Sequence, residues 1–516
     1  ETVIDQHDFV VVANRLPVDQ VTDPDGNYAV TNYLQDKIYK GMVSSQESYN
    51  AAGVLFGKSV NTWDFKILIT GNVSVFPYLK RADSYLYDGV ASDRRTAQEF
   101  FYDETTQYGN LTKSIEYGEV NLTTGVDSGN DKRTTESTYL NSSSLWLLGL
   151  PKQVTIKSNG GSQVRQTSFY YDNHPNLTDA PTKGQLTKRV RWGGTGAPTP
   201  TDFYSYDAVG NLLSTSDPKG NVTTITYDPL KLFPLTTTNA LGHVATTEYY
   251  GINGVSLNNG AGLLGLWGQV KSVKDANNQI AYRVYDTFGR MIKSISPLDS
   301  VTYPTTSVDY LYTSTFLSVT SHARKTSGAA ATIDGVEYYD GLGRLIQSKA
   351  KTVTAGQYII GGQTQYNSRG LPQYKYVPRF TANALTVMDP IDTAQPKVTI
   401  TYDATGRVLR TTNPNGTYSN TVYDGWKTSQ YEERGARNDY TYDAYGRVVK
   451  VQEYGGYDGR SPTLYPAVTH FVHSTTNYTY DSEGNLKSVI DTQNNTATIS
   501  YDNLGRKTSM SDPDMG

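Results

Sequence analysis

The chain has 516 residues, with 46 Lys and Arg against 50 Asp and Glu, so its formal net charge is −4. This balance argues against a nucleic-acid binder, which usually shows a basic excess on one face. Tyrosine occurs 42 times, beside 13 Phe and 5 Trp, and such an aromatic content is not typical of disorder. Tyr and Thr suit pleated strands, whereas Gly, Asn and Asp suit turns, so the composition favours a β-rich protein.

Two classes of feature are excluded at the same level. There is no cysteine, so neither a disulfide framework nor a Cys-ligated zinc site is possible. No window approaches 18 uninterrupted apolar residues, so no membrane-spanning helix is expected. A Cys-free chain rich in Tyr, Thr and Asn is typical of a bacterial secreted or cell-surface protein, and we expect that localisation.

Residues 1–100 are expected to form an irregular β N-terminal region that leads into the repeats. Strands are predicted at Asp8–Leu16 and Trp63–Thr70. The stretch Phe9–Asp19 resembles the opening strand and loop of trehalose-phosphate synthases, in which Arg15 would imitate a phosphate-holding arginine. That family also needs a Gly-Gly loop and two α/β domains, which do not follow here, so a plain strand and loop is the favoured interpretation.

Residues 101–205 are expected to form a degenerate region of worn repeats and strands. Worn units begin at Tyr102 and Tyr171, and Trp146–Lys152 predicts an apolar strand that Gly and Pro bring to an end. Gly193–Pro200 (GGTGAPTP) is predicted to be a loop and a weak boundary.

Residues 206–516 carry a regular repeat that decides the fold. The six-residue unit Tyr-Asp-x-x-Gly-Asn/Arg occurs seven times, and worn copies begin at Tyr227, Tyr366 and Tyr423. Tyr206 and Tyr227, Tyr402 and Tyr423, and Tyr480 and Tyr501 share a spacing of 21 residues. The defining Tyr, Asp and Gly residues, predicted to form structural repeat turns, are Tyr206, Asp207, Gly210, Tyr285, Asp286, Gly289, Tyr339, Asp340, Gly343, Tyr402, Asp403, Gly406, Tyr442, Asp443, Gly446, Tyr480, Asp481, Gly484, Tyr501, Asp502 and Gly505.

The unit is suited to a chain reversal. An Asp after a strand accepts backbone N–H groups two residues on, and a Gly three residues later takes a positive φ without steric cost. A second turn signal follows about halfway to the next unit, as in Ser216–Asn221 and Thr412–Thr417. One repeat is therefore predicted to be one β-hairpin, with the tyrosines forming part of a ladder along the sheet.

The seven units and their mid-repeat turns resemble the Rhs/YD-repeat family. That family includes Rhs effectors, the B and C components of insecticidal Tc toxins, wall-associated YD proteins and the teneurins. The resemblance implies an all-β fold, in which a spiral of YD-repeat β-hairpins forms part of a hollow, cocoon-like shell. In toxins of this kind the shell encloses a variable C-terminal toxic segment.

The resemblance also implies an Asp-dependent self-cleavage motif at the end of the core. Asp512 and Asp514 are the only candidates, but Asp512-Pro513 occupies the place of the mid-repeat turn Asp217-Pro218. We therefore expect no catalytic residue. The unit opened at Tyr501 lacks a return strand before Gly516, which indicates a chain truncated in mid-repeat.

Neither a metal site nor a cofactor site is predicted. His470 and His473 are the only histidines close in sequence, and residues three apart on a strand point to opposite faces. Turn Asp residues follow no EF-hand or nonapeptide calcium pattern.

Two functions are compatible with these features. The first is a non-enzymatic shell of a bacterial YD-repeat toxin, whose partners are the remaining shell and the toxic cargo, with a delivery component or a cell-surface receptor as further candidates. The second is a surface adhesin or cell–cell interaction protein that uses the shell as a rigid scaffold. A hypervariable segment after the repeats would favour the toxin, whereas an anchor or a receptor-binding module would favour adhesion.

Overall fold

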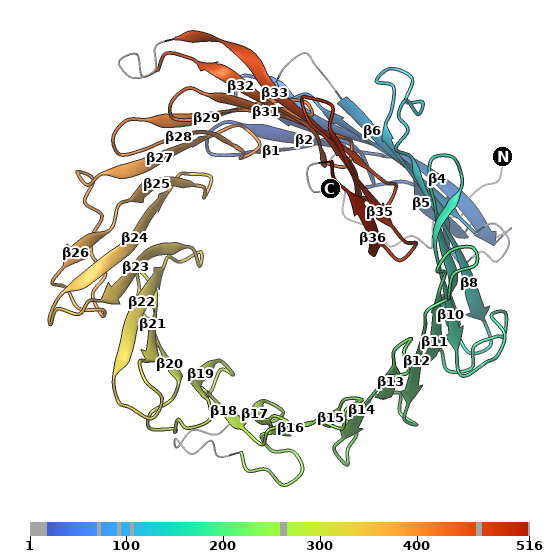
Figure 1. The fold of residues 1–516 in the computed structure, drawn as a ribbon, viewed down its shortest axis with the longest axis horizontal. Helices are drawn as coiled ribbons and strands as arrows, with labels where there is room; N and C mark the ends of the chain where they lie inside the picture. The colour runs from blue at the N-terminus through green and yellow to red at the C-terminus, as the bar shows by residue number, and fades with distance from the viewer. Residues whose placement is uncertain are drawn as a thin grey trace. The chain divides into compact units, whose positions relative to one another are not determined.

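The computed structural model describes residues 18–69, 74–89, 94–103, 108–257, 266–460 and 467–513 (Figure 1). In these ranges all the regular secondary structure is β-strand, and there are 36 strands. The all-β prediction is therefore confirmed. Residues 1–17, with the predicted strand at Asp8–Leu16 and with Arg15, lie outside the described residues, as do Asp514 and Gly516.

The chain divides into two compact units. The first unit consists of residues 1–200, 368–371 and 400–516, and the second of residues 201–367 and 372–399. One division falls after Pro200, at the end of the Gly193–Pro200 loop. These two units are defined by spatial contacts, whereas the three regions expected from the sequence are defined by the regularity of the repeat. Those three regions stay a prediction.

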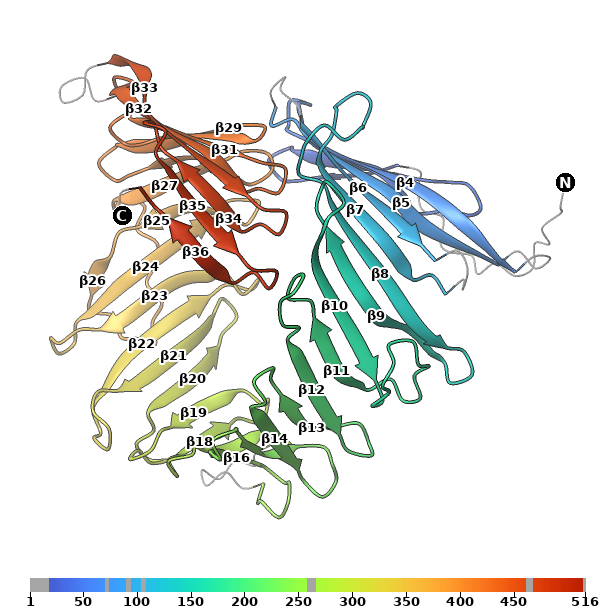
Figure 2. The ribbon, with the colours of Figure 1, turned by 45° about the vertical axis from the view of Figure 1, so that its right-hand side comes forward.

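The strands of the first unit form two runs in which neighbours in sequence pair antiparallel, β1 to β11 and β28 to β36. Figure 2 shows β4 to β11 side by side in chain order. Their bounds are β1 Val18–Thr22, β2 Tyr28–Tyr33, β3 Val43–Tyr49, β4 Leu55–Ile69, β5 Ser74–Leu86, β6 Arg94–Tyr102, β7 Leu111–Glu119, β8 Arg133–Ser142, β9 Leu147–Lys157, β10 Gln163–Tyr171, β11 Leu186–Arg191, β28 Val408–Thr412, β29 Tyr418–Asp424, β30 Lys427–Tyr431, β31 Arg437–Tyr442, β32 Val448–Tyr457, β33 Val468–Tyr480, β34 Leu486–Ile490, β35 Thr496–Tyr501 and β36 Lys507–Ser511.

The second unit is one antiparallel run that starts at β12. Its strand β24 pairs with β25 near one end and with the short β26 near the other, and β25 then pairs with β27. The bounds are β12 Thr201–Tyr206, β13 Leu212–Ser216, β14 Val222–Tyr227, β15 Pro234–Thr238, β16 Val244–Tyr249, β17 Val270–Lys274, β18 Ile280–Tyr285, β19 Met291–Ile295, β20 Thr306–Tyr312, β21 Leu317–Arg324, β22 Thr332–Tyr339, β23 Leu345–Lys351, β24 Tyr358–Tyr366, β25 Pro372–Tyr376, β26 Arg379–Thr381 and β27 Lys397–Tyr402, the last of which ends in the first unit.

Few side chains are fully buried. All six residues of β2 are half-buried, and only scattered apolar residues such as Tyr338 (0% exposed) and Ile360 (1%) leave solvent completely. The exposed area is 29433 Å², whereas a compact monomer of this mass exposes roughly 19,000 Å². Contacts between adjacent strands, and not a thick apolar core, therefore carry most of the stability, as in other repeat proteins.

One strand prediction is wrong in its end point. Gly149 and Pro151 do not end the apolar strand, because β9 continues to Lys157. Gly149 takes a positive φ of 73°, and Pro151 lies opposite Tyr139 at a shift of register. A bulge accommodates a proline that a regular ladder would exclude.

The Tyr-Asp repeat junction as candidate structural site

Each Tyr-Asp unit closes its hairpin with the same hydrogen bonds, as Asp403 illustrates. Its Oδ1 accepts the backbone N–H groups of Thr405 and Arg407, both at 2.9 Å, and its carbonyl accepts the N–H of Gly406 at 3.1 Å. These bonds define an Asx turn combined with a β-turn. The same arrangement occurs at Asp207, Asp286, Asp340, Asp443, Asp481 and Asp502.

The unit glycines have the backbone conformation that the turn argument predicts. Their φ values are 100° at Gly210, 80° at Gly289, 76° at Gly343, 89° at Gly406, 74° at Gly446, 91° at Gly484 and 76° at Gly505. An L side chain is strained in this left-handed region, so the backbone conformation of the turn requires glycine at this position.

The tyrosine of the unit marks a β-bulge. Tyr339 lies opposite Leu345, and the register shifts between Tyr338 and Tyr339. The same shift falls immediately before the unit tyrosine at Tyr206, Tyr285, Tyr442, Tyr480 and Tyr501. Each bulge adds local right-handed twist to the strand pair.

The side chain of the sixth residue of the unit donates a hydrogen bond to the aspartate carboxylate, a role that the sequence analysis did not predict. Arg344 Nε donates to Asp340 Oδ2 at 2.7 Å, and the Arg of four further units does the same. Where the sixth residue is Asn, as at Asn485, its Nδ2 donates to Asp481 Oδ2 at 2.9 Å. Arg and Asn both carry N–H donors that suit a carboxylate, which explains why the unit accepts either.

The same arginine joins one unit to the next. The Arg344 guanidinium carbon lies 4.5 Å from the ring centroid of Tyr366, and the Tyr366 hydroxyl donates to the carbonyl of Leu345 at 2.8 Å. Leu345 is itself the bulge partner of Tyr339. The pairs Arg407 with Tyr423 and Arg447 with Tyr480 repeat the stacking at 4.0 and 4.7 Å, with equivalent hydroxyl bonds to Val408 and Val448.

The charge state of the junction follows from these partners. Burial acts to raise the pKa of Asp403, but the N–H and guanidinium of Arg407 and the Thr405 hydroxyl outweigh it, so the pKa of Asp403 is lowered. The pKa of Asp340 is lowered in the same way against the effect of burial, by the N–H and guanidinium of Arg344. Both carboxylates are therefore ionised at neutral pH and act as hydrogen-bond acceptors, not as general acids.

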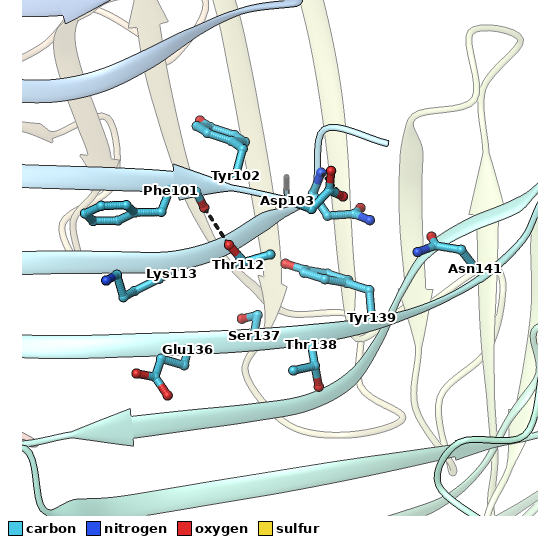
Figure 3. A pocket seen from close by; sticks show the side chains of 11 residues that line it. Phe101, Tyr102, Asp103, Thr112, Lys113, Glu136, Ser137, Thr138, Tyr139 and Asn141 are labelled. Carbon is cyan, nitrogen blue, oxygen red and sulfur yellow. Dashed lines mark hydrogen bonds between the residues drawn. The ribbon is translucent and has the colours of Figure 1, made fainter. Parts of the chain in front are cut away.

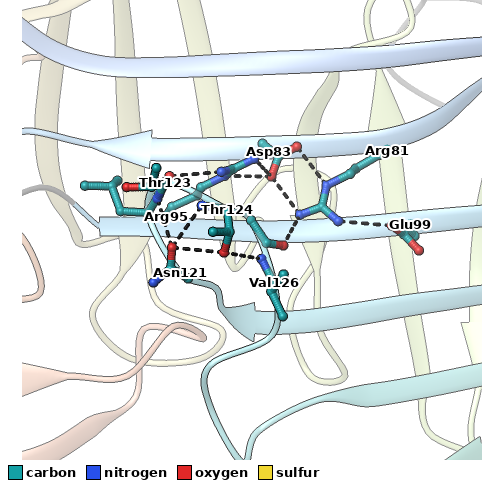
Figure 4. Close-up of polar contacts among 10 residues, drawn as sticks. Arg81, Asp83, Arg95, Glu99, Asn121, Thr123, Thr124 and Val126 are labelled. Atoms are coloured by element: carbon teal, nitrogen blue, oxygen red, sulfur yellow. Dashed lines mark hydrogen bonds and ion pairs between the residues drawn. The ribbon is translucent and has the colours of Figure 1, made fainter.

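A buried ionic cluster lies in the first unit on β5 and β6 (Figure 4). Asp83 is 4% exposed and accepts from Arg81 Nε and Arg95 Nε, each at 2.9 Å, while Arg81 also bonds Glu99. The two guanidinium groups reach on to backbone carbonyls of the loop between β7 and β8. The buried charges are paired with one another. The hydrogen bonds from the two arginines to the carbonyls hold the loop between β7 and β8 against β5 and β6.

One hollow of the first unit lies at another junction. Its lining side chains come from β6, β7 and β8 and from the turn after Tyr102 (Figure 3). Asp103 bonds Asn110 through both its N–H and its carboxylate, and the Tyr139 hydroxyl donates to the carbonyl of Leu111 at 2.7 Å. The hydroxyl bond is that of the regular repeats, and the Asp103 carboxylate again accepts a backbone N–H group at the start of the next strand, which agrees with a worn unit at Tyr102.

Two residues considered for chemistry, His470 and Asp512, lie in the first unit. His470 Nε2 is 2.9 Å from the carbonyl of Gly435, and Asp512 directly follows β36. Within the described ranges, no three His, Asp or Glu side chains are grouped to hold a metal ion, and no helix suited to crossing a membrane occurs.

Two family models match parts of the chain. The RHS repeat model matches residues 206–244 and 480–514, and a model described as a domain of unknown function (DUF6443) matches residues 312–437. None of the curated proteins matches the chain in sequence.

Solved Tc toxin structures share the fold over almost the whole chain. The TcdB2–TccC3 structure has a TM-score of 0.72 at 13% identity, over 97% of this chain and 32% of that one. TcdB2–TccC3 without its hypervariable C-terminal region has a TM-score of 0.72 at 12% identity, over 95% of this chain and 36% of that one. The Photorhabdus luminescens Tc holotoxin pore has a TM-score of 0.70 at 12% identity, over 94% and 36%.

This chain thus spans about a third of the length of the chains it matches. The repeat units, the RHS repeat model and the shared fold agree, so the predicted resemblance to the Rhs/YD-repeat family is confirmed, and the chain carries RHS repeats at residues 206–244 and 480–514.

Proposed function

We propose that this chain is a section of the wall of a secreted bacterial toxin shell, of the Tc or Rhs kind, and that it performs no catalysis. The shell encloses a toxic segment supplied from outside residues 1–516. The remaining shell and the cargo are its partners, and a delivery component or a cell-surface receptor acts on the assembled shell.

One observation carries the proposal. The same junction recurs from unit to unit, and its polar groups are used in turns and in links between units. A wall needs many equivalent, mutually supporting joints, whereas an active site needs one unusual place where polar groups converge on a substrate.

The comparison with TcdB2–TccC3 supports the separation of wall and cargo. The likeness is the same, at a TM-score of 0.72, with the hypervariable C-terminal region of that protein present or removed. The likeness does not depend on that region, which supports a role of this chain in the wall.

Protease protection tests the proposal. In the protein expressed from its complete gene, we expect the segment outside the repeats to resist a broad-specificity protease at neutral pH. It should become sensitive at the urea concentration at which the far-ultraviolet β signal is lost. Cleavage of that segment in the native protein as fast as in the isolated segment would contradict a shell and favour an exposed module, as an adhesin would carry.

A further inference from the structure

Four turn tips of the second unit expose large apolar side chains. They occupy the fourth position of the Tyr-Asp unit, directly before the residue with positive φ. Val209 is 71% exposed, Leu230 67%, Phe288 81% and Leu342 80%. Water-exposed apolar groups in a row are typical of a surface that another protein segment covers.

The four tips lie at one edge of the sheet. Tyr-Asp turns follow β12, β14, β18 and β22, which are separated by even numbers of strands in an antiparallel run. Alternate strands of such a run point the same way, so their ends share an edge. The mid-repeat turns, such as the one at Asp217, lie at the opposite edge.

In the first unit the same position is a docking position. Arg369, in the worn unit from Tyr366, pairs with Asp23 at 2.9 Å. The Tyr445 hydroxyl donates to the carbonyl of Asp131 at 2.8 Å, and Glu483 pairs with Arg165 at 2.7 Å. The side chains of Arg369 and Glu483 are only 13% and 10% exposed.

The receiving groups of the first unit have a common location. Asp23 lies in the turn between β1 and β2, Asp131 in the loop between β7 and β8, and Arg165 at the start of β10. All three lie near the ends of odd-numbered strands, β1, β7 and β9, and so at the edge opposite to the one at which Tyr102 and Tyr171 end β6 and β10. The Tyr445 contact joins residues 314 positions apart in sequence. The first unit therefore contains a seam in which a Tyr-Asp edge meets the opposite edge of a distant stretch of the same kind of sheet.

We infer that the apolar tips of Val209, Leu230, Phe288 and Leu342 are the docking row for a further stretch of Rhs-repeat sheet from outside residues 1–516, which presents its mid-repeat turn edge to them. The seam in the first unit argues for this occupant, because the position in the unit and the type of edge are the same. The side chains differ in kind: the seam uses Arg, Tyr and Glu against polar partners, so the covering turns of the second row are expected to be apolar. The inference rests on the proposed shell, because its occupant is a further stretch of the same wall, but it does not depend on what the shell encloses.

The absence of cysteine allows a clean test. Single variants Val209→Cys, Leu230→Cys, Phe288→Cys and Leu342→Cys each carry one thiol. Phe203→Cys and Ile333→Cys are matched controls, because Phe203 (51% exposed) and Ile333 (59%) lie on strands, on opposite faces of the sheet. Labelling by a charged maleimide is followed in the 516-residue chain and in the protein from the complete gene.

In the 516-residue chain the four tips should react as fast as the controls, at every protein concentration. In the complete protein they should react about tenfold more slowly, while at least one control keeps its rate. Tips that react equally fast in both proteins would overturn the inference, and so would protection in the 516-residue chain that grows with its concentration, which a second copy would cause. A photo-crosslinker on the thiol at position 288 should capture a mid-repeat turn of an Rhs repeat, and capture of a segment without repeats would equally refute the docking row.

Discussion

At the scale of single residues, the junction separates two requirements that the unit places side by side. The aspartate supplies the hydrogen bonds of the turn, and the glycine supplies its backbone conformation. Gly343 has a φ of 76° and open space where a Cβ would lie, whereas Gly341 of the same turn has similar open space without a positive φ. An alanine would meet no steric clash at either position, so a comparison of the two substitutions measures the cost of positive φ alone.

Gly343→Ala should lower the free energy of unfolding by about 1–2 kcal/mol, because alanine is strained in the left-handed region. Gly341→Ala, its matched control, should leave stability unchanged or raise it by about 0.4–1 kcal/mol. Urea unfolding followed by circular dichroism measures both. Equal effects of the two substitutions would show that positive φ is not what the turn requires.

The link between units is testable by a double-mutant cycle. Arg344→Gln and Tyr366→Leu each remove one side of the stacked pair, and the double variant removes both. We expect a coupling energy of about 0.5–1 kcal/mol, as for exposed cation–π pairs. A coupling indistinguishable from zero would mean that the two side chains lie close without stabilising the joint.

The two halves of the junction differ in how far the sequence predicts them. Asp340 and Gly343 act within their own turn, so the local pattern predicts them. The stacking of Arg344 on Tyr366 depends on the strand pairing and the bulge at Tyr339, which place residues of successive units together. The sequence does show Arg at the sixth position with Tyr in the following unit, and that recurrence was the available signal.

At the scale of elements, the segment between β26 and β27 is the clearest departure from a plain hairpin ladder. It folds over Lys349 of β23, whose side chain is 0% exposed. Lys349 Nζ lies 2.7 Å from Asp389 Oδ2 and donates to the carbonyls of Asn383, Ala384 and Val387 at 2.8 to 3.0 Å. Burial opposes ionisation of Asp389, but Lys349, Asn383 and Thr381 outweigh it and lower its pKa.

Lys349→Met should destabilise the chain by about 3–5 kcal/mol, because it leaves a buried carboxylate and three carbonyls without their cation. Lys351→Met is the matched control on the same strand, since the Lys351 side chain is 53% exposed and its ion pair with Asp334 is long, at 3.9 Å. This substitution should change the free energy of unfolding by less than about 0.5 kcal/mol. Urea unfolding measures both effects, and hydrogen exchange should show residues 381–389 opening first in the Lys349→Met variant. A loss of stability similar to that of the control would show that the contacts of Lys349 do not hold the segment between β26 and β27 in place.

A pH-dependent contact crosses β20, β21 and β22. His322 Nδ1 lies 2.8 Å from Asp334 and Nε2 lies 3.1 Å from Asp309. Burial acts to lower the pKa of His322, but the hydrogen bonds and charges of the two aspartates outweigh it and raise the pKa. A raised folded pKa adds stability that is complete below the ordinary value near 6.5 and is lost as the pH rises through the folded value.

The stability difference between wild type and His322→Asn should therefore be larger at about pH 5.5 than at about pH 8.5. Thermal unfolding across that range measures it. Asp309→Asn keeps the imidazole but removes one partner, so it should reduce the pH dependence without abolishing it. A difference that stays flat across the range would exclude a stabilising imidazolium.

The sequence predicts elements well only where turn chemistry repeats. Strand β14, Val222–Tyr227, begins directly after the predicted mid-repeat turn Ser216–Asn221 and ends at the predicted unit tyrosine, because Asp217 and Gly220 define one end of it and Tyr227 the other. Strand β9 was predicted too short, because a bulge tolerates Pro151 in a way that composition alone does not reveal. The contacts of Lys349 with the segment between β26 and β27 could not be predicted from a local sequence pattern, since its carbonyl partners are backbone groups.

At the scale of the whole molecule, the repeats make a sheet whose strength is distributed. Each hairpin is bonded to the next through the ladder, the bulge and the Arg–Tyr link, so no single joint holds the chain together. The large exposed area agrees with a sheet that has no thick apolar core. The RHS repeats could be predicted from seven short units, whereas the seam of the first unit could not, because Tyr445 and Asp131 have no recognisable relation in sequence.

Electron cryomicroscopy of the protein from its complete gene tests the central claim most directly. The map should show the strands of residues 18–513 as part of a continuous curved sheet, with separate density for a non-repeat segment on its enclosed side. Two compact sandwiches, or a sheet with the non-repeat segment outside it in solvent, would contradict the shell.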